Sequence, residues 1–117
     1  MLIFTKEVVR KLAANGTASA VGAGEKECDH WPVVKIFNPC GGATWLLTES
    51  DPDEPDRLFG LCDLGHGYPE LGYVSRHELE TTRGRFGLHM ERDRWFKANK
   101  PLSEYADEAR SLSRINA

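Results

Sequence analysis

The sequence predicts an α+β domain: a four-stranded, mainly antiparallel sheet over about residues 33–74, covered on one face by an N-terminal helix, a short helix near 75–82 and a C-terminal helix. Short apolar runs separated by turn residues follow one another between 33 and 74, and links this short permit antiparallel but not parallel pairing. Segments with helix-start signals flank these runs. A chain of 117 residues buries roughly two-thirds of the surface that its unfolded form exposes, so we expect one globular domain spanning 1–117.

Composition and the first residues of the chain predict a location in the cytoplasm. Hydrophobic residues make up 40% of the chain and charged residues 28%, as in ordinary globular proteins. Thr5, Lys6 and Glu7 interrupt the apolar start, so no secretory signal is expected, and no apolar run approaches the ~20 residues of a membrane-spanning helix. Three cysteines, an odd number, fit a reducing compartment better than a disulfide framework. We therefore expect a cytoplasmic protein without a membrane partner.

The first helix has a clear start signal. Thr5 is the expected N-cap, and Glu7 lies at the positive end of the helix dipole. An apolar stripe follows, made of Val8, Val9, Leu12 and Ala13. Asn15 and Gly16 resemble a left-handed helix stop, which predicts a helix from about 6 to 14. The residues of 17–30 show no sustained period, which predicts a loop.

Four segments are typical of strands: 33–37, 43–49, 57–64 and 71–74. In the second, Trp45 and Leu47 point one way while Thr44, Leu46 and Thr48 point the other. The acidic, proline-containing run 51–56 cannot join the sheet, because two prolines lack ladder donors, and it is expected to be a solvated loop.

The second half of the chain contains two further helix signals. Ser75 and Glu78 form a capping box, which predicts a short helix to about Thr82. Gly84 and Gly87 bracket a turn, and 91–96 forms a further short element whose type stays open. After Pro101, apolar residues recur at helical spacing and predict a final helix that docks on the sheet; they are Leu102, Tyr105, Ala106, Ala109 and Leu112.

Four sequence blocks carry a resemblance to a known family. They are FNPCGGATWLLTE at 37–49, LFGLCDLGHGYPELG at 58–72, FGLHMERDRWF at 86–96 and PLSEYADEAR at 101–110. With these blocks in this order, the chain resembles a family of short bacterial proteins with a domain of unknown function. Members of that family are often encoded on plasmids and integrative elements. The resemblance implies an accessory, mobile-element setting, and it implies neither an activity nor catalytic residues.

The stretch 58–80 concentrates reactive side chains. Cys62, Asp63 and His66 lie within five residues of one another, and Glu70 follows. A nucleophilic Cys62 would need a base and an oxyanion donor, for which the N–H groups of the turn glycines are available. His66, Asp63 and Glu70 would alternatively serve acid–base chemistry. The competing interpretation makes Cys62 a strand-interior residue and His66 an exposed turn residue, so these four residues are catalytic candidates only.

Soft and borderline metal ligands also occur, at Cys28, His30, Cys40, Cys62 and His66. Their spacing is irregular and no CxxC pair exists, whereas structural zinc sites have regular spacing. We expect no metal and no cofactor.

Basic and aromatic residues are interleaved between 83 and 100. Residues 76–100 carry seven bases and four acids, whereas residues 41–75 carry one base and seven acids. Such interleaving is typical of single-stranded nucleic-acid binders, and the candidate residues are Arg83, Arg85, Arg92, Arg94, Trp95 and Lys97, with Lys100, Phe86 and Phe96. The alternative is a salt-bridged turn in which Glu91 pairs with Arg92 or Arg94 and the aromatic rings pack inward.

Three functional hypotheses follow. The first is a non-enzymatic accessory protein of a mobile element that binds a protein partner. The second is a small nucleic-acid-binding module that uses the 83–100 region. The third is a thiol- or metal-dependent hydrolase centred on 62–78.

Overall fold

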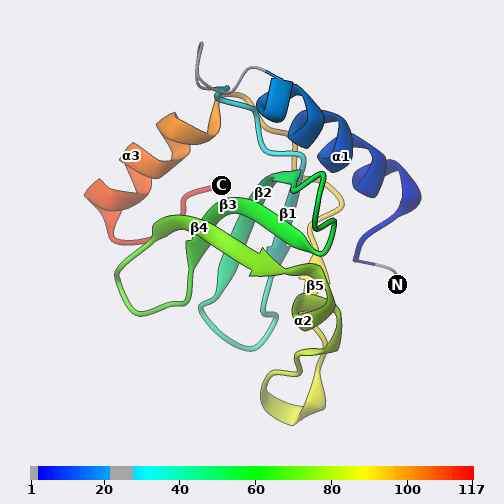
Figure 1. Cartoon of the computed structure of the whole chain (residues 1–117). Helices are drawn as coiled ribbons and strands as arrows, with labels where there is room; N and C mark the ends of the chain where they lie inside the picture. The colour runs from blue at the N-terminus through cyan, green and yellow to red at the C-terminus, as the bar shows by residue number, and fades with distance from the viewer. Residues whose placement is uncertain (1–2, 22–27) are drawn as a thin grey trace.

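A computed structural model describes residues 3–21 and 28–117 and confirms the α+β class (Figure 1). Along the chain come α1 (Lys6–Val21), β1 (Val34–Phe37), β2 (Thr44–Ser50), β3 (Arg57–Asp63) and β4 (Glu70–Ser75). They are followed by α2 (Arg76–Thr81), the 3-10 turn η1 (Arg85–Gly87), β5 (Glu91–Arg92) and α3 (Leu102–Leu112). None of these described helices combines the length and apolar character needed to cross a membrane.

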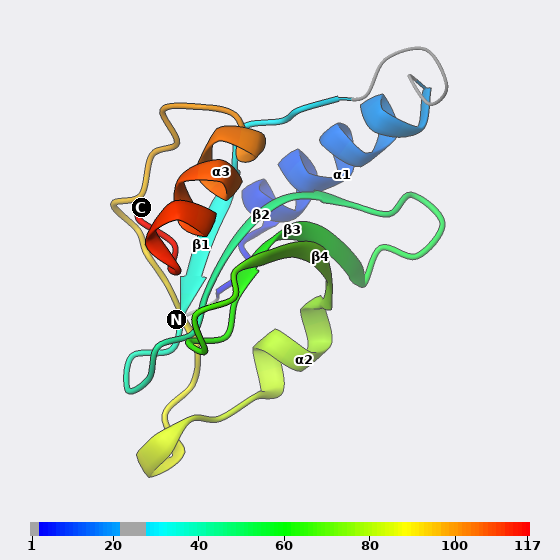
Figure 2. The same cartoon turned by 90° about the vertical axis from the view of Figure 1, so that its left-hand side faces the viewer.

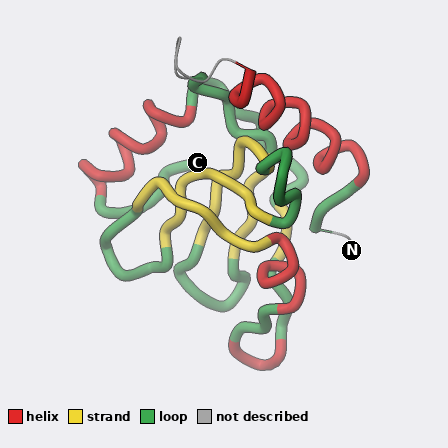
Figure 3. The backbone as a smooth tube through the Cα atoms, viewed as in Figure 1, coloured by secondary structure: helices red, strands yellow, loops and turns green. Residues whose placement is uncertain are grey.

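The five strands form one antiparallel sheet in the order β4-β3-β2-β1-β5 (Figure 3). The four predicted strands are present, each within one residue of its expected limits. The fifth strand comes from the segment whose type the sequence left open: Ile36 pairs with Arg92 and Phe37 with Glu91. The sheet is therefore wider by one short edge strand than the sequence predicts.

One face of the sheet packs against α1 and α2. Leu12 of α1 and Leu79 of α2 belong to the same buried cluster as Ile36, Leu47 and Leu58 of the sheet. The N-terminal segment closes this core with Phe4, which is also buried.

The other face packs against α3, so the prediction that all helices cover one face is wrong. Leu46 and Leu61 form a second buried cluster with Tyr105 and Ala109 of α3. Leu46 and Leu61 oppose each other in the β2–β3 ladder, and side chains alternate between the faces of a strand. The central strands are therefore apolar on both sides, and each side requires a helix. Figure 2 shows α1 and α3 lying apart, on either side of the strands.

The predicted end of the first helix is also wrong. Thr5 does cap the helix, since its Oγ1 accepts the N–H of Val8 at 3.2 Å. Asn15 does not stop it, and its side-chain amide instead donates to the carbonyl oxygen of Thr48 at 2.8 Å. Gly16 lies against β2 so closely that a Cβ there would be 1.8 Å from the Ser50 carbonyl oxygen. The helix continues to 21, so the predicted loop begins later; its residues 22–27 lie outside the described part of the chain.

The start of α2 is fixed by two side chains. Ser75 Oγ accepts the N–H of Glu78 at 3.2 Å, as the capping box predicts. Asp56, from the acidic loop, accepts the Ser75 hydroxyl at 2.5 Å and the His77 N–H at 2.8 Å. The Ser75 hydroxyl and then the His77 N–H lower the pKa of the Asp56 carboxyl below its ordinary value of 3.8. The acidic loop is thus partly a capping device for α2.

Replacing Gly16 by Ala tests the contact between α1 and β2. Helix propensity alone would make the Gly16→Ala variant more stable by roughly 1 kcal/mol. The added methyl group would overlap the Ser50 carbonyl, so we expect the free energy of unfolding to fall by about 1–3 kcal/mol, the usual range for overpacking. Urea unfolding followed by circular dichroism measures the sign of the change. Ala14→Gly, at an exposed position of the same helix, is the control for propensity; a stabilised Gly16→Ala variant would contradict the close packing.

Replacing Asp56 by Asn tests the second cap of α2 through its pH dependence. A carboxyl group whose pKa is lowered by folding stabilises the folded state above its unfolded pKa, and this contribution is lost as the pH falls through the folded pKa. The stability difference between the wild type and Asp56→Asn is therefore expected to be largest above pH 3.8 and to shrink below it. Urea unfolding at about pH 6 and about pH 3 measures it. Asp53→Asn removes an exposed carboxylate from the same loop and serves as the charge control; an equal loss at both pH values in Asp56→Asn would contradict the cap.

Candidate functional site

A hairpin over residues 83–89, here called the tip hairpin, projects beyond α2 (Figures 1 and 2). Arg83 and His89 form its bridge, and the Gly84 N–H donates to the Leu88 carbonyl oxygen at 2.8 Å. The Leu88 N–H donates to the Arg85 carbonyl oxygen at 3.3 Å and closes the end of the hairpin. The tip hairpin is thus held by its own backbone hydrogen bonds rather than by a core.

Phe86 occupies an unfavourable position at the end of this hairpin. Its φ is 62° and its ψ is 19°, and Gly87 follows with φ 70°. Two consecutive left-handed residues are the signature of a type I′ turn, which favours Asn, Asp or Gly at both central positions. A large side chain in this conformation costs about 1–2 kcal/mol. Phe86 is also 85% exposed, and its ring contacts the guanidinium of the neighbouring Arg85, 5.8 Å from the ring centroid, rather than a core.

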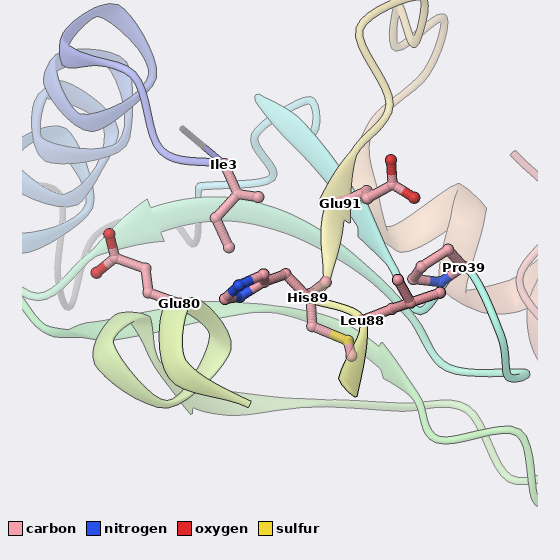
Figure 4. A pocket seen from close by; sticks show the side chains of 7 residues that line it. Ile3, Pro39, Glu80, Leu88, His89 and Glu91 are labelled. Carbon is pink, nitrogen blue, oxygen red and sulfur yellow. The ribbon is translucent and has the colours of Figure 1, made fainter. Parts of the chain in front are cut away.

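An apolar groove lies at the base of the tip hairpin, with a volume of about 490 Å³ (Figure 4). Its lining comes from the N-terminal segment, the β1–β2 turn, α2 and the strand that follows the hairpin. The lining residues are Ile3, Pro39, Glu80, Leu88, His89, Met90 and Glu91. Ile3 and Met90 are buried, whereas Leu88 is exposed, so a docked side chain would bury further apolar surface here.

Two polar side chains of the groove, His89 and Glu80, already have partners. The Arg83 Nη1 lies 3.1 Å from the His89 Nε2, and because a guanidinium can only donate, that imidazole nitrogen is the acceptor. The His89 ring points toward Glu80 (Figure 4). Glu80 in turn pairs with Arg76 at 3.4 Å. No Ser, Thr, Cys or Lys lines the groove, so the arrangement suits binding better than covalent chemistry.

The structure does not gather the candidates from 62–70 into one catalytic centre. Cys62 is half-buried against the core on the α1 side, and burial raises the pKa of its thiol to about 11. A thiol with this pKa is protonated at neutral pH, whereas the thiolate is the nucleophile. Glu70 opposes Cys62 in the ladder but is exposed at the edge of the sheet.

Asp63 and His66 are likewise separated. Asp63 is 3% exposed, and its two carboxylate oxygens accept the N–H groups of Gly65 at 2.8 Å and Ile115 at 3.0 Å. It therefore shapes the β3–β4 turn and ties the chain that follows α3 to the sheet. His66 is exposed in that turn, so it faces water and not Asp63. A catalytic role for these residues stays a prediction.

The candidate zinc ligands are dispersed as well. Cys28 and His30 border a cavity of about 280 Å³, Cys40 lies in the β1–β2 turn, and Cys62 and His66 lie as described above. Within residues 3–21 and 28–117, no group of three or more His, Cys, Asp or Glu could hold a metal ion.

The sequence did not reveal a cluster that joins α1 to β2. Ser19 Oγ lies 3.0 Å from His30 Nε2 and donates to the Glu49 carboxylate, which is 3.7 Å from the same imidazole nitrogen. Because the single hydroxyl proton of Ser19 points to Glu49, the contact with His30 is made by the Nε2–H. The cluster fixes the C-terminal end of α1 against β2. The sequence predicted a loop for this part of the chain, because it placed the end of the helix at 14.

The nucleic-acid candidates do not form one face. Arg83 and Arg85 belong to the tip hairpin, whereas Arg94, Trp95 and Lys97 are exposed on the segment after β5. Arg92 lies between them, half-buried in β5, and donates to the Ile3 carbonyl oxygen at 3.4 Å.

The exposed aromatic rings separate two interpretations of this region. The side chain of Trp95 is 86% exposed and that of Phe86 85%, so the alternative in which the aromatic rings pack inward is wrong for these two. Phe96 is half-buried and packs on the α3 side of the core.

Comparisons with known proteins give a family and no more. Comparison with curated proteins and with solved structures finds no match. One family model matches residues 3–116, which is nearly the whole chain. The chain therefore belongs to the family described as Protein of unknown function (DUF2958).

Proposed function

We propose that this chain is a non-enzymatic, protein-binding accessory protein of a mobile genetic element, and that it binds its partner with the tip hairpin and the apolar groove. The observation that carries the proposal is Phe86, a large aromatic side chain that is fully presented to solvent in a backbone conformation that disfavours it. Strained residues of this kind concentrate at binding sites, where the strain serves presentation.

The surface around Phe86 has the composition of a binding hot spot. Exposed Phe86 and Leu88 adjoin a groove that is already apolar at its base, and aromatic anchors that fill such grooves dominate the affinity of many interfaces. Glu80 and Glu91 supply carboxylates to the groove. The partner segment that complements this surface carries an apolar side chain flanked by basic residues.

The mobile-element setting rests on the sequence. The blocks at 37–49, 58–72, 86–96 and 101–110 resemble proteins that are often encoded on plasmids and integrative elements. Two of these blocks, 37–49 and 86–96, supply Pro39 and residues 88–91 to the groove.

Phe86→Asn separates binding from folding. Asn accepts the left-handed conformation more readily than Phe does, so we expect the free energy of unfolding to rise by about 1 kcal/mol. The same change should abolish capture of the partner from a lysate of the native host, scored by quantitative mass spectrometry against the wild type. Trp95→Ala removes an equally exposed aromatic side chain elsewhere and should capture the partner normally.

Partner capture and the free energy of unfolding of Phe86→Asn each test one part of the proposal. If Phe86→Asn captures the same proteins as the wild type, the tip hairpin is not the binding surface. A variant that unfolds more easily than the wild type would remove the strain argument.

One observation favours a second candidate, binding of single-stranded nucleic acid. Trp95 is almost entirely exposed between two exposed cations, Arg94 and Lys97. The backbone N–H of Trp95 donates to the Asp93 carboxylate at 2.9 Å, which holds the local turn, and Asp93 pairs with Lys35 at 3.5 Å. An exposed indole with flanking cations offers a stacking surface for bases.

Trp95→Ala tests this second candidate. Base stacking on an aromatic ring contributes about 1–3 kcal/mol, so loss of the indole is expected to weaken binding of a fluorescent single-stranded oligonucleotide at low salt by about tenfold or more. Fluorescence anisotropy measures the affinity. Trp31→Ala, which removes another exposed indole, and Phe86→Asn are the controls and should bind as the wild type does. A wild-type chain that does not bind the oligonucleotide at low salt excludes the candidate.

A further inference from the structure

A close contact joins the tip hairpin to the turn between β1 and β2. Of the residues of the hairpin, 83–89, all of which are described, Gly84 alone is half-buried and the others are exposed. A Cβ on Gly84 would lie 2.8 Å from the Oδ1 of Asn38 and 3.1 Å from its Nδ2. Asn38 directly follows β1, so the base of the hairpin packs against a side chain of the β1–β2 turn.

This contact, and not the backbone conformation, accounts for a glycine at position 84. The φ of Gly84 is −84° and its ψ is −158°, an extended conformation that other residues also adopt. Its N–H donates to the Leu88 carbonyl oxygen at 2.8 Å, and its carbonyl oxygen accepts the Gly87 N–H at 3.2 Å. The backbone of Gly84 therefore serves the hairpin itself, and the glycine is needed because any Cβ would overlap the Asn38 amide.

The Asn38 amide is held in its place by its own turn. Its Oδ1 accepts the Cys40 N–H at 3.0 Å, which is an Asx turn. Gly41 approaches the same amide so closely that a Cβ there would lie 2.6 Å from Nδ2. The Asn38 N–H donates to the Ala43 carbonyl oxygen at 3.0 Å, which fixes the backbone as well. The amide is thus a fixed surface against which the hairpin rests, and it contacts glycines of two segments that are distant in sequence.

The β1–β2 turn also forms part of the apolar groove. Pro39, the neighbour of Asn38, lines the groove together with Leu88 of the hairpin (Figure 4). Movement of the hairpin against this turn would therefore change the shape of the groove and the position of Phe86 relative to it.

We propose that Asn38 is a positioning residue of the binding surface: its amide holds the tip hairpin in one orientation against the β1–β2 turn, so that Phe86 and the groove are presented together. The consequence for binding rests on the proposed function, whereas the order of the hairpin does not. A hairpin that is ordered before the partner docks loses less conformational entropy on binding, so Asn38 raises affinity without contacting the partner.

Backbone order parameters from ¹⁵N relaxation test the positioning role without a partner. For residues 84–88 of the wild type they are expected near about 0.85, as in rigid backbone, and in Asn38→Ala below about 0.6, with the strands unchanged. Asn38→Asp keeps the shape of the side chain and the oxygen that the Cys40 N–H requires, so its hairpin is expected to stay ordered. Cys40→Ala, in the same turn, is the control and should also leave the hairpin ordered.

Gly84→Ala disturbs the same contact from the side of the hairpin and leaves the β1–β2 turn intact. Its methyl group would overlap the Asn38 amide, so we expect the amide resonances of 84–88 to shift. The overlap is absent in the Asn38→Ala background, where the same change is expected to shift these resonances much less. Such non-additivity is the mark of two residues that share one contact.

Partner capture separates the positioning role from the proposed function. Asn38→Ala is expected to capture about tenfold less of the partner than the wild type does, and Asn38→Asp as much as the wild type. An ordered hairpin in Asn38→Ala, equal shifts in both backgrounds, or normal capture by a disordered hairpin would overturn the inference. If order falls as expected but Phe86→Asn captures the same proteins as the wild type, Asn38 still positions the hairpin and the proposed function fails.

Discussion

Burial of both faces of β2 and β3 is the constraint on which the rest of this structure depends. Leu46 and Leu61 face α3, Leu47 and Leu58 face α1, and none of the four is more than 1% exposed. A sheet that is apolar on both sides requires a layer on each side, and the chain supplies these layers from its two ends. The buried Asp63 carboxylate secures the second layer, because it binds the backbone N–H of Ile115 just beyond α3. A residue that first suggests acid–base chemistry thus holds the two halves of the fold together.

The exposed features of the molecule lie where this packing ends. The tip hairpin is inserted between α2 and β5, and the free edge of β4 lies one strand away from the central pair. Within the core, Cys62 is a half-buried strand residue whose raised pKa disfavours the reactive thiolate. At the periphery, Phe86 and Trp95 present large apolar surfaces that contribute to neither buried cluster. The division between packed interior and exposed aromatic groups favours recognition over catalysis.

The sequence predicted correctly those elements that are determined by short-range sequence signals. Turn residues and alternation located the four main strands, and the capping box at Ser75 located α2. The end of α1 was mispredicted because Gly16 permits two explanations, a left-handed stop or a close approach, and only the position of Ser50 decides between them. The second helical layer was missed although Leu46 alternates with Trp45 and Leu47. The cluster of Ser19, His30 and Glu49 joins residues distant in sequence, and no local pattern reveals it.

The left-handed conformation of Phe86 could not be predicted for a different reason. Phenylalanine disfavours the backbone conformation that the structure shows at this position. Such a conflict persists where the surrounding structure or a function maintains the residue, and in the proposed function it is contact of the exposed ring with a protein partner that maintains Phe86.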